Sequence, residues 1–100
     1  MMKREKKQPN KIEDTTFSIK SGSCVSRYGE IKDGEMHLTS EVYGDDFDSE
    51  QHISFSKADT KRILSMMTLD EFCDFYGKVG TLGLNAFIKE HKLKPKTITI

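Results

Sequence analysis

Hydrophobic side chains in the first half of the chain recur at every second position, a spacing typical of strands that bury one face. Residues 36–43 show this alternation most clearly, because Met36 and Leu38 alternate with the polar His37 and Thr39. The Asp33-Gly34 pair just before them favours a tight hairpin turn. Looser alternation predicts three more strands, over residues 12–20, 24–31 and 51–55. We therefore expect an antiparallel meander with one face on the core.

The hydrophobic spacing changes after residue 55, where two segments begin with signals of a helix N-terminus. Ser56 and Thr68 are each followed, three residues later, by an acid, Asp59 and Glu71. The second pair fits a capping box, in which each side chain bonds the backbone N–H of the other residue. Apolar residues at intervals of three and four follow both starts. We therefore expect one helix after Ser56 and another after Thr68.

The end of the chain predicts a further helix and a further strand. Gly77 and Gly80 favour an end to the second helix. Apolar positions within residues 84–91 predict a short third helix, which Pro95 stops. The β-branched residues 97–100 predict a strand that pairs back into the sheet. This order predicts an α+β domain, with a mostly antiparallel sheet and two to three helices on one of its faces.

Length and composition limit the number of domains. One hundred residues suit a single domain, and a 9% aromatic content is enough for a hydrophobic core. Residues 1–11 are rich in lysine, so we expect a flexible basic tail there and the α+β domain over residues 12–100. The formal net charge is zero, so no overall field draws the protein to nucleic acid or to an anionic membrane.

Charges of opposite sign are nevertheless gathered in separate segments. Basic residues crowd positions 3–11 and 89–96. Tyr43 and Phe47 lie in an acidic segment, residues 41–50, that has no basic residue. Its five acids are Glu41, Asp45, Asp46, Asp48 and Glu50. Carboxylates with aromatic residues among them suit docking to a basic partner, and a solvated loop is the simpler interpretation.

The sequence contains no recognisable catalytic motif. Nucleophilic catalysis by a cysteine needs a base within reach. Cys73 is predicted on the apolar face of a helix, where a cysteine usually serves as a small core residue. Zinc sites use paired ligands at short spacing, whereas the histidines are isolated. His37 and His52 could face each other across two strands, and His91 stands apart. We expect a non-enzymatic protein without a cofactor or metal.

Residues 46–50 carry acids at alternate positions, as a calcium loop does. The match then fails, because Gln51 stands where the loop glycine belongs and Lys57 where the bidentate glutamate belongs. The basic N-terminal residues are not followed by an apolar region, so we expect no secretory signal. Two cysteines in such a chain predict reduced thiols and a cytoplasmic protein.

Three stretches within about the last sixty residues carry a family resemblance. They are Tyr43-Gly44-Asp45-Asp46-Phe47-Asp48, Phe55-Ser56-Lys57-Ala58-Asp59-Thr60 and Thr68-Leu69-Asp70-Glu71-Phe72. With these stretches the chain resembles small bacterial immunity proteins of toxin–immunity systems, including those of contact-dependent growth inhibition. The resemblance implies a cytoplasmic protein that binds a cognate toxin domain, often a nuclease, and blocks it.

Three functions therefore stay open. The leading expectation is an immunity or antitoxin-like inhibitor that covers a basic toxin site. The residues expected to bind the partner are Glu41, Tyr43, Asp45, Asp46, Phe47, Asp48 and Glu50. The alternative is a nucleic-acid-associated regulatory protein that uses the lysine-rich ends. An enzyme without a known motif is the third, with Cys73 and His91 as its best residues.

Overall fold

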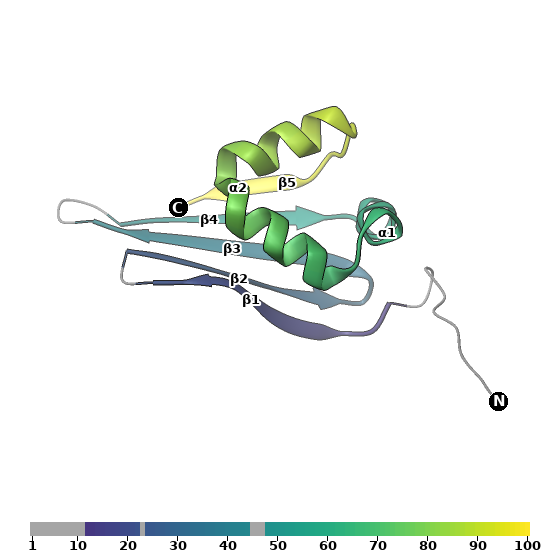
Figure 1. The fold of residues 1–100 in the computed structure, drawn as a ribbon, viewed down its shortest axis with the longest axis horizontal. Coiled ribbons are helices and arrows are strands. Elements are labelled where there is room, and N and C mark those ends of the chain that lie inside the picture. Colours follow the sequence, from purple (N-terminus) through teal and green to yellow (C-terminus); the bar gives the residue numbers. More distant parts are fainter. Residues whose placement is uncertain (1–11, 23, 45–47) are drawn as a thin grey trace.

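The computed structural model describes residues 12–22, 24–44 and 48–100, which contain a five-stranded sheet (Figure 1). The strands lie side by side in chain order, and each neighbouring pair is antiparallel. They are β1 (Thr15–Ser21), β2 (Val25–Lys32), β3 (Glu35–Tyr43), β4 (Asp48–Phe55) and β5 (Lys96–Thr99). The predicted meander and the returning C-terminal strand are both present.

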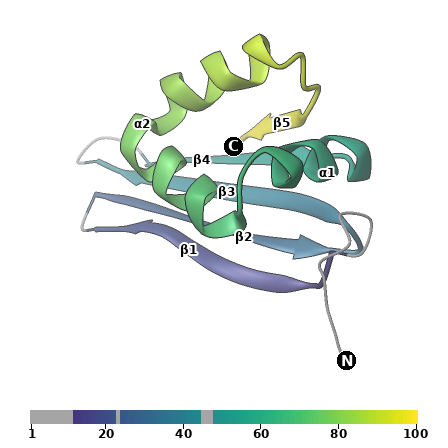
Figure 2. The same cartoon turned by 45° about the vertical axis from the view of Figure 1, so that its right-hand side comes forward.

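The two helices of the described residues cover the same face of this sheet, as both views show (Figures 1 and 2). The first, α1, spans Lys57–Met66, and the second, α2, spans Leu69–Glu90. Between helices and sheet lies the hydrophobic core, which confirms the α+β class. Its buried side chains are Ile31, Met36, Leu38, Ile53, Phe55, Ile63, Phe72, Tyr76, Leu84, Phe87 and Leu93.

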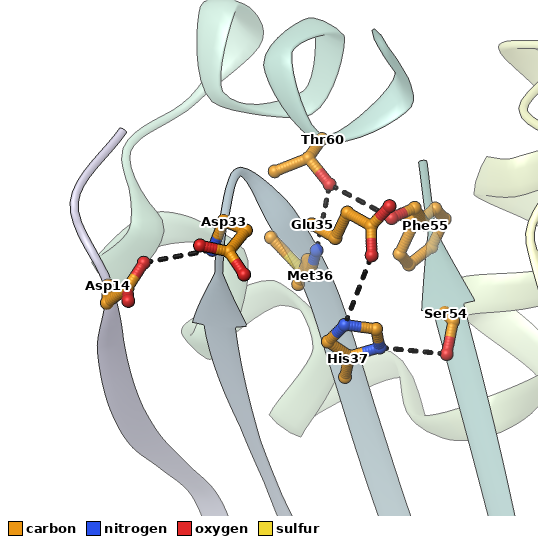
Figure 3. Close-up of polar contacts among 8 residues, drawn as sticks. All are labelled: Asp14, Asp33, Glu35, Met36, His37, Ser54, Phe55 and Thr60. Atoms are coloured by element: carbon orange, nitrogen blue, oxygen red, sulfur yellow. Dashed lines mark hydrogen bonds and ion pairs between the residues drawn. The ribbon is translucent and has the colours of Figure 1, made fainter. Parts of the chain in front are cut away.

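The hairpin between β2 and β3 closes with the predicted Asp-Gly turn. Asp33 has a φ of 54° and Gly34 a φ of 83°. Positive φ at both central residues gives the turn whose twist suits a two-residue hairpin. The Asp14 carboxylate accepts a hydrogen bond of 2.9 Å from the Asp33 N–H, which ties the start of β1 to the turn (Figure 3). The resulting register sets Met36 opposite Ile31, and both side chains are buried.

Both predicted helix starts are confirmed. The Ser56 hydroxyl accepts a hydrogen bond of 3.1 Å from the Asp59 N–H at the start of α1. Thr68 and Glu71 form the complete capping box of α2. One turn into α1, the buried Thr60 hydroxyl accepts a hydrogen bond of 3.0 Å from a backbone N–H of β3 (Figure 3). This bond fixes α1 over the β2–β3 hairpin.

Gly80 ends the first helical stretch of α2, as predicted, whereas the helix runs through Gly77. Gly80 takes φ 69° and ψ −166°, so the helix bends there and continues to Glu90. That backbone conformation is open essentially to glycine alone. The predicted third helix is therefore the second arm of α2 (Figure 2). Tyr76 and Leu84, on either side of the bend, are fully buried, so one core holds both arms.

The fourth strand also begins earlier than predicted. The sequence predicted residues 51–55, whereas β4 starts at Asp48. Residues 48–50 pair with residues 41–43 of β3, so this part of the acidic segment is strand and not loop. Pairing with β3 extends the strand through residues that lack an alternating apolar pattern.

Candidate functional site

The face of the sheet that points away from the helices is uncovered in the described residues (Figures 1 and 2). Alternate strand positions point to it, and the strand register arranges their side chains in rows. One row contains Tyr28, Thr39, His52 and Ile98. The next contains Glu41, Glu50 and Ile100, and the third contains Tyr43 and Asp48. We call the residues of these three rows the open face.

Glu41 lies at the centre of the open face and accepts hydrogen bonds from two tyrosines. The Tyr28 hydroxyl donates to one carboxylate oxygen at 2.9 Å, and the Tyr43 hydroxyl donates to the other. Bonds from Tyr43 and then Tyr28 hold the pKa of Glu41 below its usual value. The same bonds raise the pKa of Tyr28, and that of Tyr43 to about 12. Glu41 is therefore ionised at neutral pH, and both phenols are fixed in orientation.

His52 links Glu50 to the middle of the sheet. Its Nε2 lies 2.5 Å from a Glu50 carboxylate oxygen, and its Nδ1 lies 3.2 Å from the Thr39 hydroxyl. The sequence left open that His37 and His52 face each other. The structure instead sets each histidine opposite a hydroxyl residue, because His37 Nδ1 lies 2.9 Å from the Ser54 hydroxyl (Figure 3).

Two features make the open face unusual for a surface that only meets water. Four of the seven large hydrophobic side chains that are exposed in the described residues lie on it: Tyr28, Tyr43, Ile98 and Ile100. In addition, Glu41 and Glu50 are direct partners across β3 and β4. Like charges opposite each other destabilise a sheet. The open face therefore carries both exposed apolar area and three carboxylates, of which Glu50 also contacts His52.

Four of the seven predicted partner-binding residues lie on the open face, and the register brings them together. They are Glu41, Tyr43, Asp48 and Glu50. The other three, Asp45, Asp46 and Phe47, lie outside the described residues. The C-terminal lysines, at positions 89, 92, 94 and 96, have exposed side chains, and the predicted basic tail lies outside the described residues.

The sequence did not identify Tyr28, His52, Ile98 and Ile100 as part of the site. A signal was available for the last two, since the predicted strand 97–100 alternates Thr and Ile. Pairing of β5 with β4 sets Ile98 opposite His52, which only the strand order reveals. Beside Tyr28, the sheet surface is hollowed into a depression lined by Thr16, Ser18, Glu30, His37 and Thr39.

A reactive cysteine, a metal site or a membrane-spanning helix in the described residues would also point to a function. Partial burial, with Asp70 and Asp74 nearby, raises the pKa of the Cys73 thiol, which disfavours the nucleophilic thiolate. Within residues 12–22, 24–44 and 48–100, three or more His, Cys, Asp or Glu side chains nowhere gather in a way that could hold a metal ion. None of the helices in this part of the chain is long and apolar enough to cross a membrane.

Comparison with known proteins gives no further guide, because no protein family, curated protein or solved structure matches the chain. The geometry and charge of the open face therefore carry the functional argument.

The pKa shifts around Glu41 predict a pH dependence. Tyr43 should ionise near pH 12 and not near 10.0, as followed by phenolate absorbance. A raised tyrosine pKa means that the Glu41–Tyr43 bond stabilises the fold fully below pH 10 and is lost as the pH rises through 12. The lowered pKa of Glu41 means that its contribution is present above 4.5 and fades as the pH falls further.

Two variants check this assignment. Glu41→Gln should return the Tyr43 midpoint towards 10.0, since the ionised acceptor is gone. Tyr43→Phe should remove that high-pH transition and leave those of Tyr28 and Tyr76. An unchanged midpoint in Glu41→Gln would contradict the hydrogen bond.

Proposed function

We propose that this chain is a non-enzymatic, cytoplasmic immunity or antitoxin-like protein that binds a basic toxin domain, such as a nuclease, and blocks it. The contact surface is the open face. The observation that carries this proposal is the combination of two exposed, hydrogen-bonded tyrosines with a repelling pair of carboxylates on an uncovered sheet. The resemblance of the sequence to immunity proteins supplies the class of partner.

Tyr28 and Tyr43 suit the role of anchors. Tyrosine is enriched among the residues that contribute most to protein–protein binding, because it buries a large area at a small entropic cost. Both hydroxyls already donate to Glu41, so the rings are held in place before the partner arrives. Preorganisation of this kind lowers the cost of association. Ile98 and Ile100 extend the apolar area on the β5 side.

The carboxylates favour a basic partner. Glu41 and Glu50 repel each other in the free protein, and a lysine or arginine placed between them would remove that repulsion. Asp48 adds a third negative charge in the next row. Complementary charge speeds association and rejects partners of the wrong sign. A nuclease domain presents basic groups to the phosphate backbone, so it has the required surface.

The proposal predicts that a toxin domain is encoded beside this chain in its source genome and that this chain neutralises it. Co-expression of the two should restore growth of the host cell. Replacing Glu41, Asp48 and Glu50 with lysine should abolish this protection, because the same face would then repel the toxin. Purified proteins should show the loss as a fall in affinity of at least about a hundredfold.

A matched control reverses three exposed carboxylates elsewhere, Glu13, Asp74 and Glu90, with the same change in formal charge. This variant should protect as well as the parent chain. Equal loss in both variants would show an effect of net charge and contradict docking on the open face. Full protection by the open-face variant, with its fold confirmed by circular dichroism, would also overturn the proposal.

A further inference from the structure

A second polar cluster lies on the other side of the sheet, beneath the bend of α2. The Arg27 guanidinium of β2 donates from Nε to the Ser40 hydroxyl at 3.3 Å and from Nη2 to the Thr81 hydroxyl at 3.5 Å. Its central carbon lies 5.5 Å from the centre of the Tyr76 ring. We call Arg27, Ser40, Tyr76 and Thr81 the Arg27 cluster. It is separate from the open face, because Ser40 and Arg27 point to the helices.

The charge of Arg27 has no counter-charge in this cluster. None of the described carboxylates lies within ion-pair distance of it. Both of its hydrogen bonds are long and go to neutral hydroxyls, although a guanidinium has five donors. A partly buried cation is costly unless it is paired and fully hydrogen-bonded. The cluster therefore favours the arrival of a negative charge.

The Tyr76 hydroxyl is a second, independent indication that the cluster favours an anion. Tyr76 is fully buried, and its hydroxyl has no hydrogen-bond partner among the described residues. Burial raises its pKa, so the group stays a neutral donor, with Arg27, Thr81 and Ser40 close by. A buried hydroxyl without a partner costs free energy comparable to a lost hydrogen bond. It is a donor placed beside an unpaired cation.

The bend of α2 supplies the third element. Gly80 interrupts the helical backbone, so residues 81–90 begin a new helical arm next to Arg27. The first N–H groups of a helical arm have no acceptors within it, and its N-terminus favours negative charge. Apart from its chain neighbours and the nearby helix backbone, a side chain carbon added at Gly80 would meet no atom within 4 Å, so Gly80 itself faces open space.

We propose that the Arg27 cluster binds a small oxyanion of the phosphate type. The guanidinium of Arg27 pairs with it, the N–H groups at the start of the second arm of α2 bind its oxygens, and the Tyr76 hydroxyl donates to it. When such an anion binds, Arg27 replaces two long hydrogen bonds to neutral hydroxyls with charge-assisted hydrogen bonds to the anion. It also gives the Tyr76 hydroxyl an acceptor. The site follows from the same chemistry as other anion sites at helix N-termini.

Titration with sodium phosphate tests this site, with sodium chloride at equal ionic strength as the reference. Amide signals of Thr81, Leu82 and Gly83 in two-dimensional NMR spectra should shift saturably with phosphate and not with chloride. Arg27→Gln should weaken binding by at least about tenfold. Lys20→Gln removes the positive charge of the residue that pairs with Arg27 across β1 and β2, and it should change the affinity less than about twofold.

Two further variants keep the test decisive. Tyr76→Phe should weaken phosphate binding severalfold if the hydroxyl is a ligand, and an unchanged affinity would overturn that role. Arg27→Lys is the substitute if Arg27→Gln does not fold. It keeps the charge but loses the planar guanidinium, so it should bind phosphate more weakly than the parent chain but still measurably. Absence of saturable shifts up to about 50 mM phosphate, well above the millimolar range of weak sites, would overturn the site itself. Equal weakening by Arg27→Gln and Lys20→Gln would do so too.

Discussion

Replacing Gly29 with valine should destabilise the protein by about 3 kcal/mol, although valine is a far better strand former than glycine. Gly29 lies in the middle of β2, opposite Phe17 on β1 and Leu38 on β3. A side chain carbon at this position would lie 2.7 Å from the His37 carbonyl oxygen and 2.7 Å from a carbon of the Phe17 ring. Real carbons do not approach so closely, so the sheet or the ring has to move.

The cost is large because neither neighbour gives way cheaply. The His37 carbonyl belongs to the backbone of β3, and its displacement disturbs the pairing of β2 with β3. The Phe17 ring packs against the hydrophobic core. Overpacking of this kind typically costs about 1–3 kcal/mol, and the backbone clash places Gly29→Val at the upper end. Urea unfolding measures the change in the free energy of unfolding.

Gly22→Val is the matched control, because a side chain carbon there meets only the Val25 carbonyl oxygen at an ordinary 3.6 Å. It should change the free energy of unfolding by less than about 1 kcal/mol. A Gly29→Val variant as stable as the parent chain would show that β1, β2 and β3 do not approach each other as described.

Replacing Gly80 with alanine should destabilise the protein by about 2 kcal/mol. The reason differs from that at Gly29, since no atom lies within 4 Å of the added carbon. The whole cost comes from the backbone, which holds φ at 69° and ψ at −166°. Residues other than glycine rarely adopt this conformation, so alanine must either bear the strain or straighten α2. Straightening would pull Tyr76 or Leu84 out of the core, where both are fully buried.

Gly77→Ala is the sharpest control, because it lies in the same helix three residues earlier. Its added carbon would meet the Ile19 carbonyl oxygen at 3.4 Å, within ordinary contact distance. Alanine is the better helix former by about 1 kcal/mol, so this variant should be neutral or stabilised. Urea unfolding of the two variants should therefore give changes of different sign or size. Equal effects would contradict the bend.

The sequence predicted the sheet well where burial alternates, as in β3, and predicted both helix starts from local capping chemistry. It did not predict which face of the second strand Tyr28 is on, because apolar residues alternate only loosely there. The structure explains why. In β2, the residue opposite the core residue Leu38 is Gly29, so one apolar residue is missing from the alternation there. Tyr28 therefore points to the open face and not to the core.

Other differences arise from long-range contacts that no local pattern contains. The sequence predicted the break at Gly80, but not that one core holds the helical arms on both sides of it. Glu41, Tyr43, Asp48 and Glu50 are close in sequence, and the pairing of β3 with β4 sets them on one face. Ile98 joins them from more than forty residues away through β5. The Arg27 cluster likewise joins residues from β2, β3 and α2, whose proximity depends on helix packing.

The strand order has a consequence for how the protein reaches this structure. Pairs from β1 to β4 join neighbours in the chain through short connections, so the meander closes small loops and should form quickly. The pairing of β4 with β5 instead spans both helices, and closing a longer loop costs more entropy. We expect β5 to dock last. The rows that end in Ile98 and Ile100 are therefore the last to be completed, and a folding chain has the Tyr28–Glu41–Tyr43 arrangement before it has the complete open face.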